Sequence, residues 1–216
     1  MSFELDHLVV AARSLDEGEA WLRERLGVPL QPGGQHPGWG THNRLLQLGG
    51  GVYLELIAPD PSQAAPTRPR PFGLDTPELQ LRLADAPQLV HWIVRTQDID
   101  AAVRSLRYRC GPVTPMTRGA LRWRITVPAD GQPAGGGVLP TVIQWDTPSH
   151  PASLLPDQGV RLAELRVGAP AAVLALRPPV EAAAATIEWV AAPAAGLCAR
   201  VATAQGDVLI GEPAAG

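Results

Sequence analysis

Strand-like runs and helix-like stretches follow one another along the first two thirds of the chain. Within residues 6–27, an alternating apolar segment leads into apolar positions that recur at helical spacing from Leu15 to Leu26. Ser14 precedes them with the side chain of a good N-cap residue, and Gly27 follows, where a left-handed residue easily ends a helix. The pattern predicts a strand, a turn and a helix.

The same pattern recurs further along the chain. Residues 90–111 match residues 6–27 at a constant offset of 84, which pairs His7 with His91 and Gly27 with Gly111. Asp98 takes the N-cap position of the second helix, and Gly111 is expected to end it. Further strands are expected at 43–49 and 52–59 in the first copy, and at 121–128 and 141–148 in the second. The chain is therefore predicted to repeat a β-α-β-β-β module.

Glu55 stands out in the otherwise apolar run 52–59. A carboxylate in a buried strand costs several kcal/mol unless it is protonated, paired or bound to a metal. Aligning this run with 141–148 pairs Glu55 with Gln144 at an offset of 89. A polar residue therefore recurs on the last strand of each module, as a histidine does on the first.

The remaining chain is predicted to form a connector and a third section. We divide the sequence into a first module at 1–58, a proline-rich connector with a short helix at 59–87, a second module at 88–150, and a C-terminal partial third module at 151–216. The last section reads as strands at 160–168, 186–193, 197–206 and 207–212. Because exposed apolar strand edges favour association, we expect this section to be integral to the fold and the protein to be a homodimer.

Composition narrows the classes of partner. The 216 residues carry a net charge of −3, and all 18 basic residues are scattered arginines, so we expect no nucleic-acid partner. No apolar run approaches the roughly 20 residues of a membrane span, and the N-terminus shows no signal-peptide pattern. The two cysteines, Cys110 and Cys198, form no CxxC pair. These features predict a reduced, cytoplasmic protein.

Four polar side chains are predicted to meet between the modules. A pseudo-twofold axis relating the two copies brings together His7, Glu55, His91 and Gln144. Two imidazoles, a carboxylate and an amide oxygen suit a divalent metal ion, with Fe, Zn, Mn, Ni and Co all acceptable. For His91, flanked by apolar residues, the alternative is a histidine packed and hydrogen-bonded in the core.

Particular motifs resemble a known superfamily. "DHLVV" opens the first module and "YLELIAP" closes it, while "GTHNRLL", "LRWRI" and "VIQWDTPSHP" lie at matching places. Over about residues 3–150 the chain resembles the vicinal oxygen chelate superfamily, in particular its uncharacterised glyoxalase-like domain branch. The resemblance implies an α+β fold in which paired β-α-β-β-β modules form an open barrel. It also implies that His7, Glu55, His91 and Gln144 occupy the four metal-ligand positions.

One departure from the superfamily bears on the chemistry. Glyoxalase I carries a proton-shuttling carboxylate at the position aligned with Gln144, and an amide cannot accept a proton at neutral pH. Glu55 is then the one catalytic base predicted at the site. Polarisation of a chelating substrate by the metal stays open as an alternative.

Further residues are predicted to line the cleft. By analogy with the superfamily, Thr41 and Asn43 face the substrate while His42, between them, faces away. Trp123 and Trp145 are candidates for the pocket walls, with a core position as the alternative for each. These four are our candidate substrate-binding residues.

The superfamily includes isomerases, extradiol dioxygenases, epimerases and antibiotic-resistance proteins, so the activity is left as two hypotheses. The first is a divalent-metal-dependent enzyme, of isomerase, lyase or dioxygenase type, acting on a small oxygenated metabolite. The second is a metal-free protein of the bleomycin-resistance type that binds or sequesters a small molecule. His36 lies in a glycine- and proline-rich stretch, where we expect a solvated loop, with a lid as the alternative.

Overall fold

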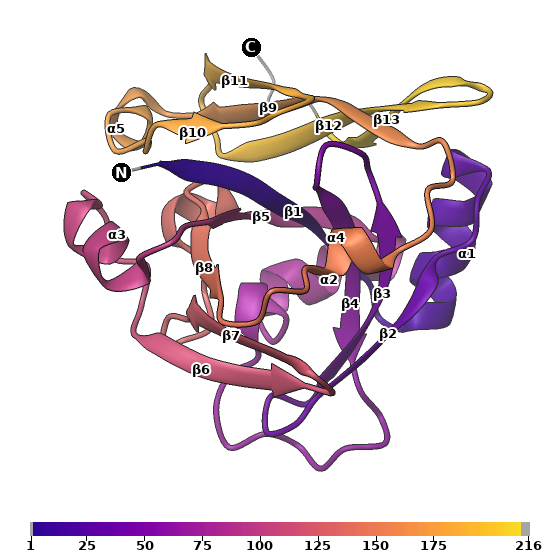
Figure 1. Ribbon diagram of the computed structural model, residues 1–216, viewed down its shortest axis with the longest axis horizontal. Coiled ribbons are helices and arrows are strands. Elements are labelled where there is room, and N and C mark those ends of the chain that lie inside the picture. Colours follow the sequence, from indigo (N-terminus) through magenta and orange to yellow (C-terminus); the bar gives the residue numbers. More distant parts are fainter. Residues whose placement is uncertain (1, 213–216) are drawn as a thin grey trace.

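The computed structural model describes residues 2–212 and shows both repeated modules (Figure 1). The first contains β1 (Phe3–Ala11), α1 (Leu15–Leu26), β2 (Gln31–His36), β3 (Thr41–Gln47) and β4 (Tyr53–Pro59). The second contains β5 (Gln88–Arg95), α3 (Ile99–Ser105), β6 (Val113–Arg118), β7 (Leu121–Thr126) and β8 (Thr141–Trp145). Each module is a β-α-β-β-β unit, as predicted.

The connector and the C-terminal section supply the other elements. Between the modules lie η1 (Pro71–Gly73) and α2 (Pro77–Asp85), and η2 (Ala134–Gly137) precedes β8. The C-terminal section contains α4 (Pro151–Leu154), β9 (Arg161–Ala169), α5 (Ala171–Leu174), β10 (Val180–Glu181), β11 (Thr186–Ala191), β12 (Gly196–Thr203) and β13 (Gly206–Gly211).

The two modules share one curved, mixed sheet. Its strands run in the order β2-β3-β4-β1-β5-β8-β7-β6, with the short β10 paired to β1. β1 and β5 pair antiparallel at the centre, so that Val9 lies opposite His91 and His7 lies opposite Ile93. This pairing produces the expected pseudo-twofold relation and confirms the glyoxalase-like α+β fold.

Two apolar clusters lie on opposite faces of this sheet. On the outer face, α1, α3 and a second sheet of order β11-β9-β12-β13 bury residues such as Leu8, Trp92 and Leu165. Figure 1 shows this second sheet, in orange and yellow, stacked over β1 and β5. On the inner face, Val9 and Ile143 belong to a smaller cluster. The C-terminal section is thus integral to the core, while the expected homodimer stays a prediction.

The predicted extent of the second helix is wrong. α3 ends at Ser105, and Leu106 already has extended backbone angles. Gly111 does not end this helix but packs closely against the chain just after β7, where an added Cβ would lie within 2.5 Å of the Val127 backbone. The glycine is needed for this close approach, and its φ of +87° is readily adopted only by glycine.

None of the helices within residues 2–212 combines the length and the apolar character needed to cross a membrane.

Candidate functional site

The inner face of the sheet borders a partly open cavity between the two modules. Its walls are largely apolar, with Ile57 and Phe72 among the contributors, and a group of polar side chains lies on the side of the first module. Six of the eight residues predicted from the sequence line it: His7, Thr41, Asn43, Glu55, Trp123 and Trp145. His91 and Gln144 do not line the cavity.

Glu55 contacts two of the predicted residues. Parallel pairing of β1 with β4 places Glu55 beside His7, with 3.5 Å between His7 Nε2 and Glu55 Oε2. Asn43 on β3 donates from Nδ2 to Glu55 Oε1 at 2.6 Å. All three side chains are nearly inaccessible to solvent. Both oxygens of the buried carboxylate therefore have a polar partner, which explains how an apolar strand accommodates Glu55.

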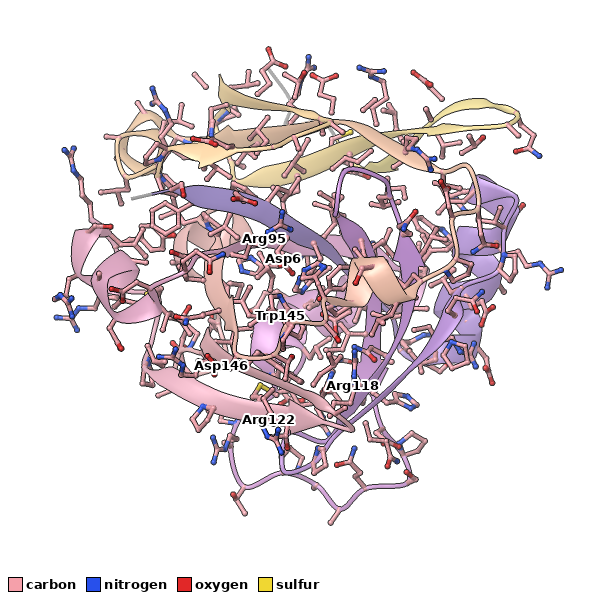
Figure 2. The ribbon with its side chains drawn as sticks, in the orientation of Figure 1. Asp6, Arg95, Arg118, Arg122, Trp145 and Asp146 are labelled. Carbon is pink, nitrogen blue, oxygen red and sulfur yellow. The ribbon has the colours of Figure 1, made fainter. Side chains whose placement is uncertain are left out.

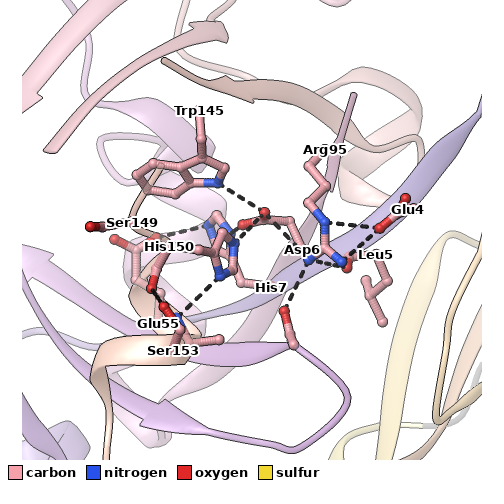
Figure 3. A network of polar contacts seen from close by, with 12 residues as sticks. Glu4, Leu5, Asp6, His7, Glu55, Arg95, Trp145, Ser149, His150 and Ser153 are labelled. Atoms are coloured by element: carbon pink, nitrogen blue, oxygen red, sulfur yellow. Dashed lines mark hydrogen bonds and ion pairs between the residues drawn. The ribbon is translucent and has the colours of Figure 1, made fainter. Parts of the chain in front are cut away.

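A second carboxylate lies behind His7. Asp6 is fully buried, and its Oδ1 lies 2.6 Å from His7 Nδ1 (Figure 3). Trp145 Nε1 donates to Asp6 Oδ2 at 3.0 Å, and His150 Nε2 lies 2.9 Å from the same oxygen. A register shift between Leu5 and His7 interrupts the alternation of β1, which lets the neighbouring side chains of Asp6 and His7 meet.

This arrangement sets the charges at the first module. Burial alone lowers the pKa of His7, but its hydrogen bonds to Asp6 and Glu55 raise that pKa to about 9. Burial raises the pKa of Glu55, but the hydrogen bond and charge of His7 outweigh it and bring that pKa to about 2. Likewise, burial opposes ionisation of Asp6, but hydrogen bonds from His150 and His7 hold its pKa well below the usual range. At neutral pH an imidazolium therefore lies between two carboxylates.

Tyr53 fixes the plane of the charged imidazole. Its ring stacks on His7 with centroids 4.4 Å apart and an interplanar angle of 18°. Burial raises the pKa of Tyr53 well above its ordinary value, so the phenol stays neutral. Tyr53 pairs directly with His7 in the β1–β4 ladder, which explains the stacking.

His91 has a different environment from His7. Its Nδ1 lies 2.7 Å from the Gly137 carbonyl oxygen, and its Nε2 lies 2.9 Å from Thr141 Oγ1. The Thr141 amide also donates to Nε2, at 3.2 Å. Burial lowers the pKa of His91 to about 4, so the ring is neutral. With Nδ1–H donating to Gly137 and Nε2 accepting from Thr141, neither nitrogen retains a free lone pair.

The register of β8 corrects the predicted equivalence of Glu55 and Gln144. Val9 pairs with Glu55 in the first module, and Ile93, which is 84 residues after Val9, pairs with Thr141 in the second. Thr141 is therefore the structural counterpart of Glu55. Gln144 lies three residues further on, and an odd shift along a strand reverses the face of the sheet.

Gln144 instead stabilises the start of a helix. Its Oε1 accepts a hydrogen bond from the Ile99 amide at 2.9 Å, at the N-terminus of α3. The alignment failed because the glycine-rich stretch 129–137 hides how many residues the second copy inserts, and the shared Pro59 and Pro148 suggested a false register. Neither the hydrophobic pattern nor the prolines distinguish the two faces of so short a strand.

These positions decide whether the residues suit a metal ion. The resemblance to the superfamily implies a divalent metal held by donors from both modules. Here the second module offers a neutral hydroxyl at Thr141 and a histidine, His91, whose ring nitrogens are both engaged. Within residues 2–212 no group of three or more His, Cys, Asp or Glu side chains is arranged to hold a metal. The residues present do not fit the predicted four-ligand set.

His36 was expected on a solvated loop, and this expectation is wrong. It is the last residue of β2, is buried, and lines the cavity, with Nδ1 2.9 Å from Thr41 Oγ1. The strand was missed because its sequence, QPGGQH, contains a proline and two glycines. Such residues are tolerated on an edge strand, and β2 is one end of the sheet.

Arg118 was also not predicted as a site residue. It ends β6, at the other edge of the sheet, and its Nη1 donates to Asn43 Oδ1 at 2.9 Å. Its side chain passes over Gly34 of β2, where an added Cβ would lie 2.6 Å from Arg118 Cδ. The paired glycines of β2 were the available signal, because they mark a close approach to the strand.

Phe72 closes another wall of the cavity. It has a left-handed backbone (φ 62°, ψ 22°), unusual for a bulky residue, and its ring centroid lies 5.4 Å from that of His91. The next residue, Gly73, donates its amide hydrogen to the Gly131 carbonyl at 2.8 Å, which ties the connector to the second module. The connector therefore contributes to the pocket as well as joining the modules.

One solved structure shares this architecture over most of its length. The crystal structure of a hypothetical protein from Staphylococcus aureus superposes with a TM-score of 0.60 at 14% identity, covering 89% of this chain and 88% of that one. Methylmalonyl-CoA epimerase from Mycobacterium tuberculosis is 25% identical, with a TM-score of 0.40 and coverage of 66% and 86%. No curated protein matches the sequence significantly.

A family profile described as a glyoxalase-like domain matches residues 5–182, which is most of the chain. The match spans both modules and the connector, and it extends into the C-terminal section. The protein therefore belongs to the glyoxalase-like domain family of the vicinal oxygen chelate superfamily.

Proposed function

We propose that this protein binds a small organic molecule in the cavity without the help of a metal ion, as a binding or sequestering protein. The observation that carries the proposal is the His91–Thr141 contact. A metal ion in the cavity would need donors from the second module at this position. The two side chains there are neutral and hydrogen-bond each other. The cavity itself is retained and has mostly apolar walls, as small-molecule sites usually do.

The polar side of the cavity is suited to orienting a ligand. His7, Glu55 and Asn43 are held by one another and by Asp6, so their positions are set before a ligand arrives. Preorganised polar groups reduce the ordering cost of binding. Tryptophan side chains supply large apolar contact area elsewhere along the walls.

A screen of small molecules by thermal shift, with and without EDTA, tests this proposal. A ligand that binds only the folded state raises the melting temperature by mass action. We expect the stabilising ligands to act equally in both conditions. Shifts that EDTA abolishes would contradict metal-free binding.

A metal-dependent enzyme is the second candidate, and the Asp6–His7 contact favours it. A carboxylate hydrogen-bonded to one imidazole nitrogen is the usual way in which a metal-binding histidine is oriented. Elemental analysis of untagged protein after metal supplementation separates the two candidates. Metal content near one ion per chain that is lost in His7→Ala and Glu55→Ala would support the enzyme; less than about 0.1 ion per chain would support metal-free binding.

A further inference from the structure

Three charged side chains line the cavity: His7, Glu55 and Arg118. They differ in whether a group of opposite charge lies beside them. The imidazolium of His7 and the carboxylate of Glu55 face each other, with Asp6 behind them. Arg118 has no such partner: within residues 2–212, no carboxylate oxygen lies within 4.0 Å of its guanidinium nitrogens. Its cationic side chain lines a cavity whose own anions are already paired.

Asn43 keeps Arg118 apart from Glu55. The amide accepts from Arg118 through Oδ1 and donates to Glu55 through Nδ2, so it lies between the cation and the carboxylate. Gly34 also donates its amide hydrogen to Asn43 Oδ1, at 2.9 Å, which fixes the orientation of the side chain. Arg118 is therefore positioned but not neutralised, and this one bond uses a single N–H of its guanidinium.

A guanidinium of this kind recognises oxygen anions. Its planar array of N–H groups matches a carboxylate, and such charge-assisted bonds are stronger in a partly desolvated site than in water. Lining the cavity without a carboxylate partner, Arg118 is available to a ligand that carries its own negative charge.

The other residues that line the cavity indicate the shape and polarity of the rest of that ligand. Trp39, Phe72, Trp123 and Trp145 all line the cavity, and Trp123 and Trp145 lie next to each other with ring centroids 5.4 Å apart. Flat aromatic walls favour a flat apolar body through stacked or edge-to-face contacts. Aromatic walls can also attract a cationic ligand, but Arg118 would repel it.

We propose that the ligand of this pocket is a small aromatic carboxylate, with its ring against the aromatic walls and its carboxylate on Arg118. This inference rests on the proposed function, since it assigns the ligand class of the same cavity. It makes Arg118, which comes from the second module, a specificity-determining residue. Figure 2 labels Arg118 and, on the adjacent strand of the same hairpin, Arg122.

The test compares matched probes by isothermal titration calorimetry in the presence of EDTA. Benzoate, phenylacetate and 3-phenylpropanoate are each compared with their primary amides, and phenethylammonium serves as the cationic probe. We expect the best carboxylate to bind at least about tenfold more tightly than its amide, equivalent to about 1.4 kcal/mol. The preference should weaken as ionic strength rises.

Two variants assign the preference to one side chain. Arg118→Met is expected to remove the advantage of the carboxylate over the amide, and Arg118→Lys to retain part of it, because a lysine keeps the charge but loses the planar geometry. Arg122→Met is the matched control: Arg122 is exposed, does not line the cavity, and should be replaceable without effect. The melting temperature of each variant is measured to establish that it is folded.

The outcomes separate this inference from the function on which it rests. Equal affinity for carboxylate and amide, tighter binding of the ammonium, or an unchanged preference in Arg118→Met would overturn the inference and leave metal-free binding intact. Failure of every aromatic probe would also overturn the ligand class. Metal-free binding itself fails if the ligands found in the wider screen depend on metal, or if the purified protein holds about one ion per chain that is lost in His7→Ala and Glu55→Ala.

Discussion

The two modules carry a histidine at the same position of the repeat, but the two imidazoles have different hydrogen-bond partners and different charge states. His7 lies between Asp6 and Glu55 and is charged, whereas His91 lies between the Gly137 carbonyl and Thr141 and is neutral. The backbone positions are related by the repeat. The difference shows that the partner side chains, and not the fold, set the protonation state of each histidine.

Two substitutions within the repeat account for the contrast. Thr141 stands where the first module has Glu55, and Val90, which is 84 residues after Asp6, stands where it has a second carboxylate. Buried charges are stable only when they are paired and hydrogen-bonded. Around His7 and Glu55 this pairing comes from Asn43 of the first module and from Trp145 and His150 of the second, whereas the second module contains no carboxylate at either place.

The largest difference is expected when the closest side-chain partner of each histidine is removed, Asp6 from His7 and Thr141 from His91. Asp6→Asn leaves the imidazolium of His7 without its closest partner, and we expect it to lower the free energy of unfolding by about 3–5 kcal/mol. Thr141→Val removes one neutral hydrogen bond from His91, which keeps the amide donor of residue 141, so we expect a loss of about 1 kcal/mol.

Urea denaturation of both variants measures these losses. Because Asp6→Asn could prevent folding altogether, Asp6→Glu serves as a milder companion that keeps the charge. Similar losses for Asp6→Asn and Thr141→Val would show that the two halves are not electrostatically different.

The two histidines also predict opposite dependences of stability on pH. The pKa of His7 is raised to about 9 in the folded protein, so its stabilising contribution is complete below pH 6.5 and is lost as the pH rises through 9. The pKa of His91 is lowered to about 4, so its contribution is complete above pH 6.5 and is lost as the pH falls towards 4. Each slope should approach about 1.4 kcal/mol per pH unit.

Proton NMR of the imidazole signals checks this directly, with His7→Gln and His91→Gln spectra used for assignment. A His91 signal that titrates near pH 6.5, or a His7 signal that does so, would remove the distinction between the halves. The unfolding free energy measured between pH 4 and 10 supplies an independent readout.

The smallest effect is expected at Gln144, which does not line the cavity. Gln144→Ala removes a hydrogen bond to the first amide of α3, and we expect a loss of about 1 kcal/mol of stability with no change in ligand affinity or metal content. Asp98→Ala, which removes the other cap of that helix, should have a similar effect. Altered ligand or metal binding in Gln144→Ala would instead place this residue at the pocket and contradict the register of β8.

The repeat, the fold class and the polar side of the pocket could be predicted because they depend on local patterns. Helix caps such as Ser14 and apolar alternation in β1 are visible within a few residues. The position of Glu55 was visible for the same reason, since its charge conflicts with its neighbours. Asp6 conflicts in the same way and was available as a signal.

What could not be predicted depends on register and on contacts distant in sequence. A three-residue uncertainty in a glycine-rich loop decided whether Gln144 or Thr141 faces the cavity. Arg118 lies 75 positions from Asn43, and nothing in its local sequence distinguishes it from Arg122. His36 was hidden because glycine and proline, which usually indicate loops, here form an edge strand.

The contact between Arg118 and Asn43 also has a consequence for how a ligand reaches the cavity. β2 and β6 are the two ends of the sheet, and at this point they are joined by side chains and not by a ladder of backbone bonds. Separating them there breaks a hydrogen bond with a net value of about 1–3 kcal/mol and leaves the core on the opposite face of the sheet intact. Amide hydrogens of β2 and β6 should therefore exchange with solvent faster than those of β1 and β5, and a ligand that holds Arg118 should slow their exchange.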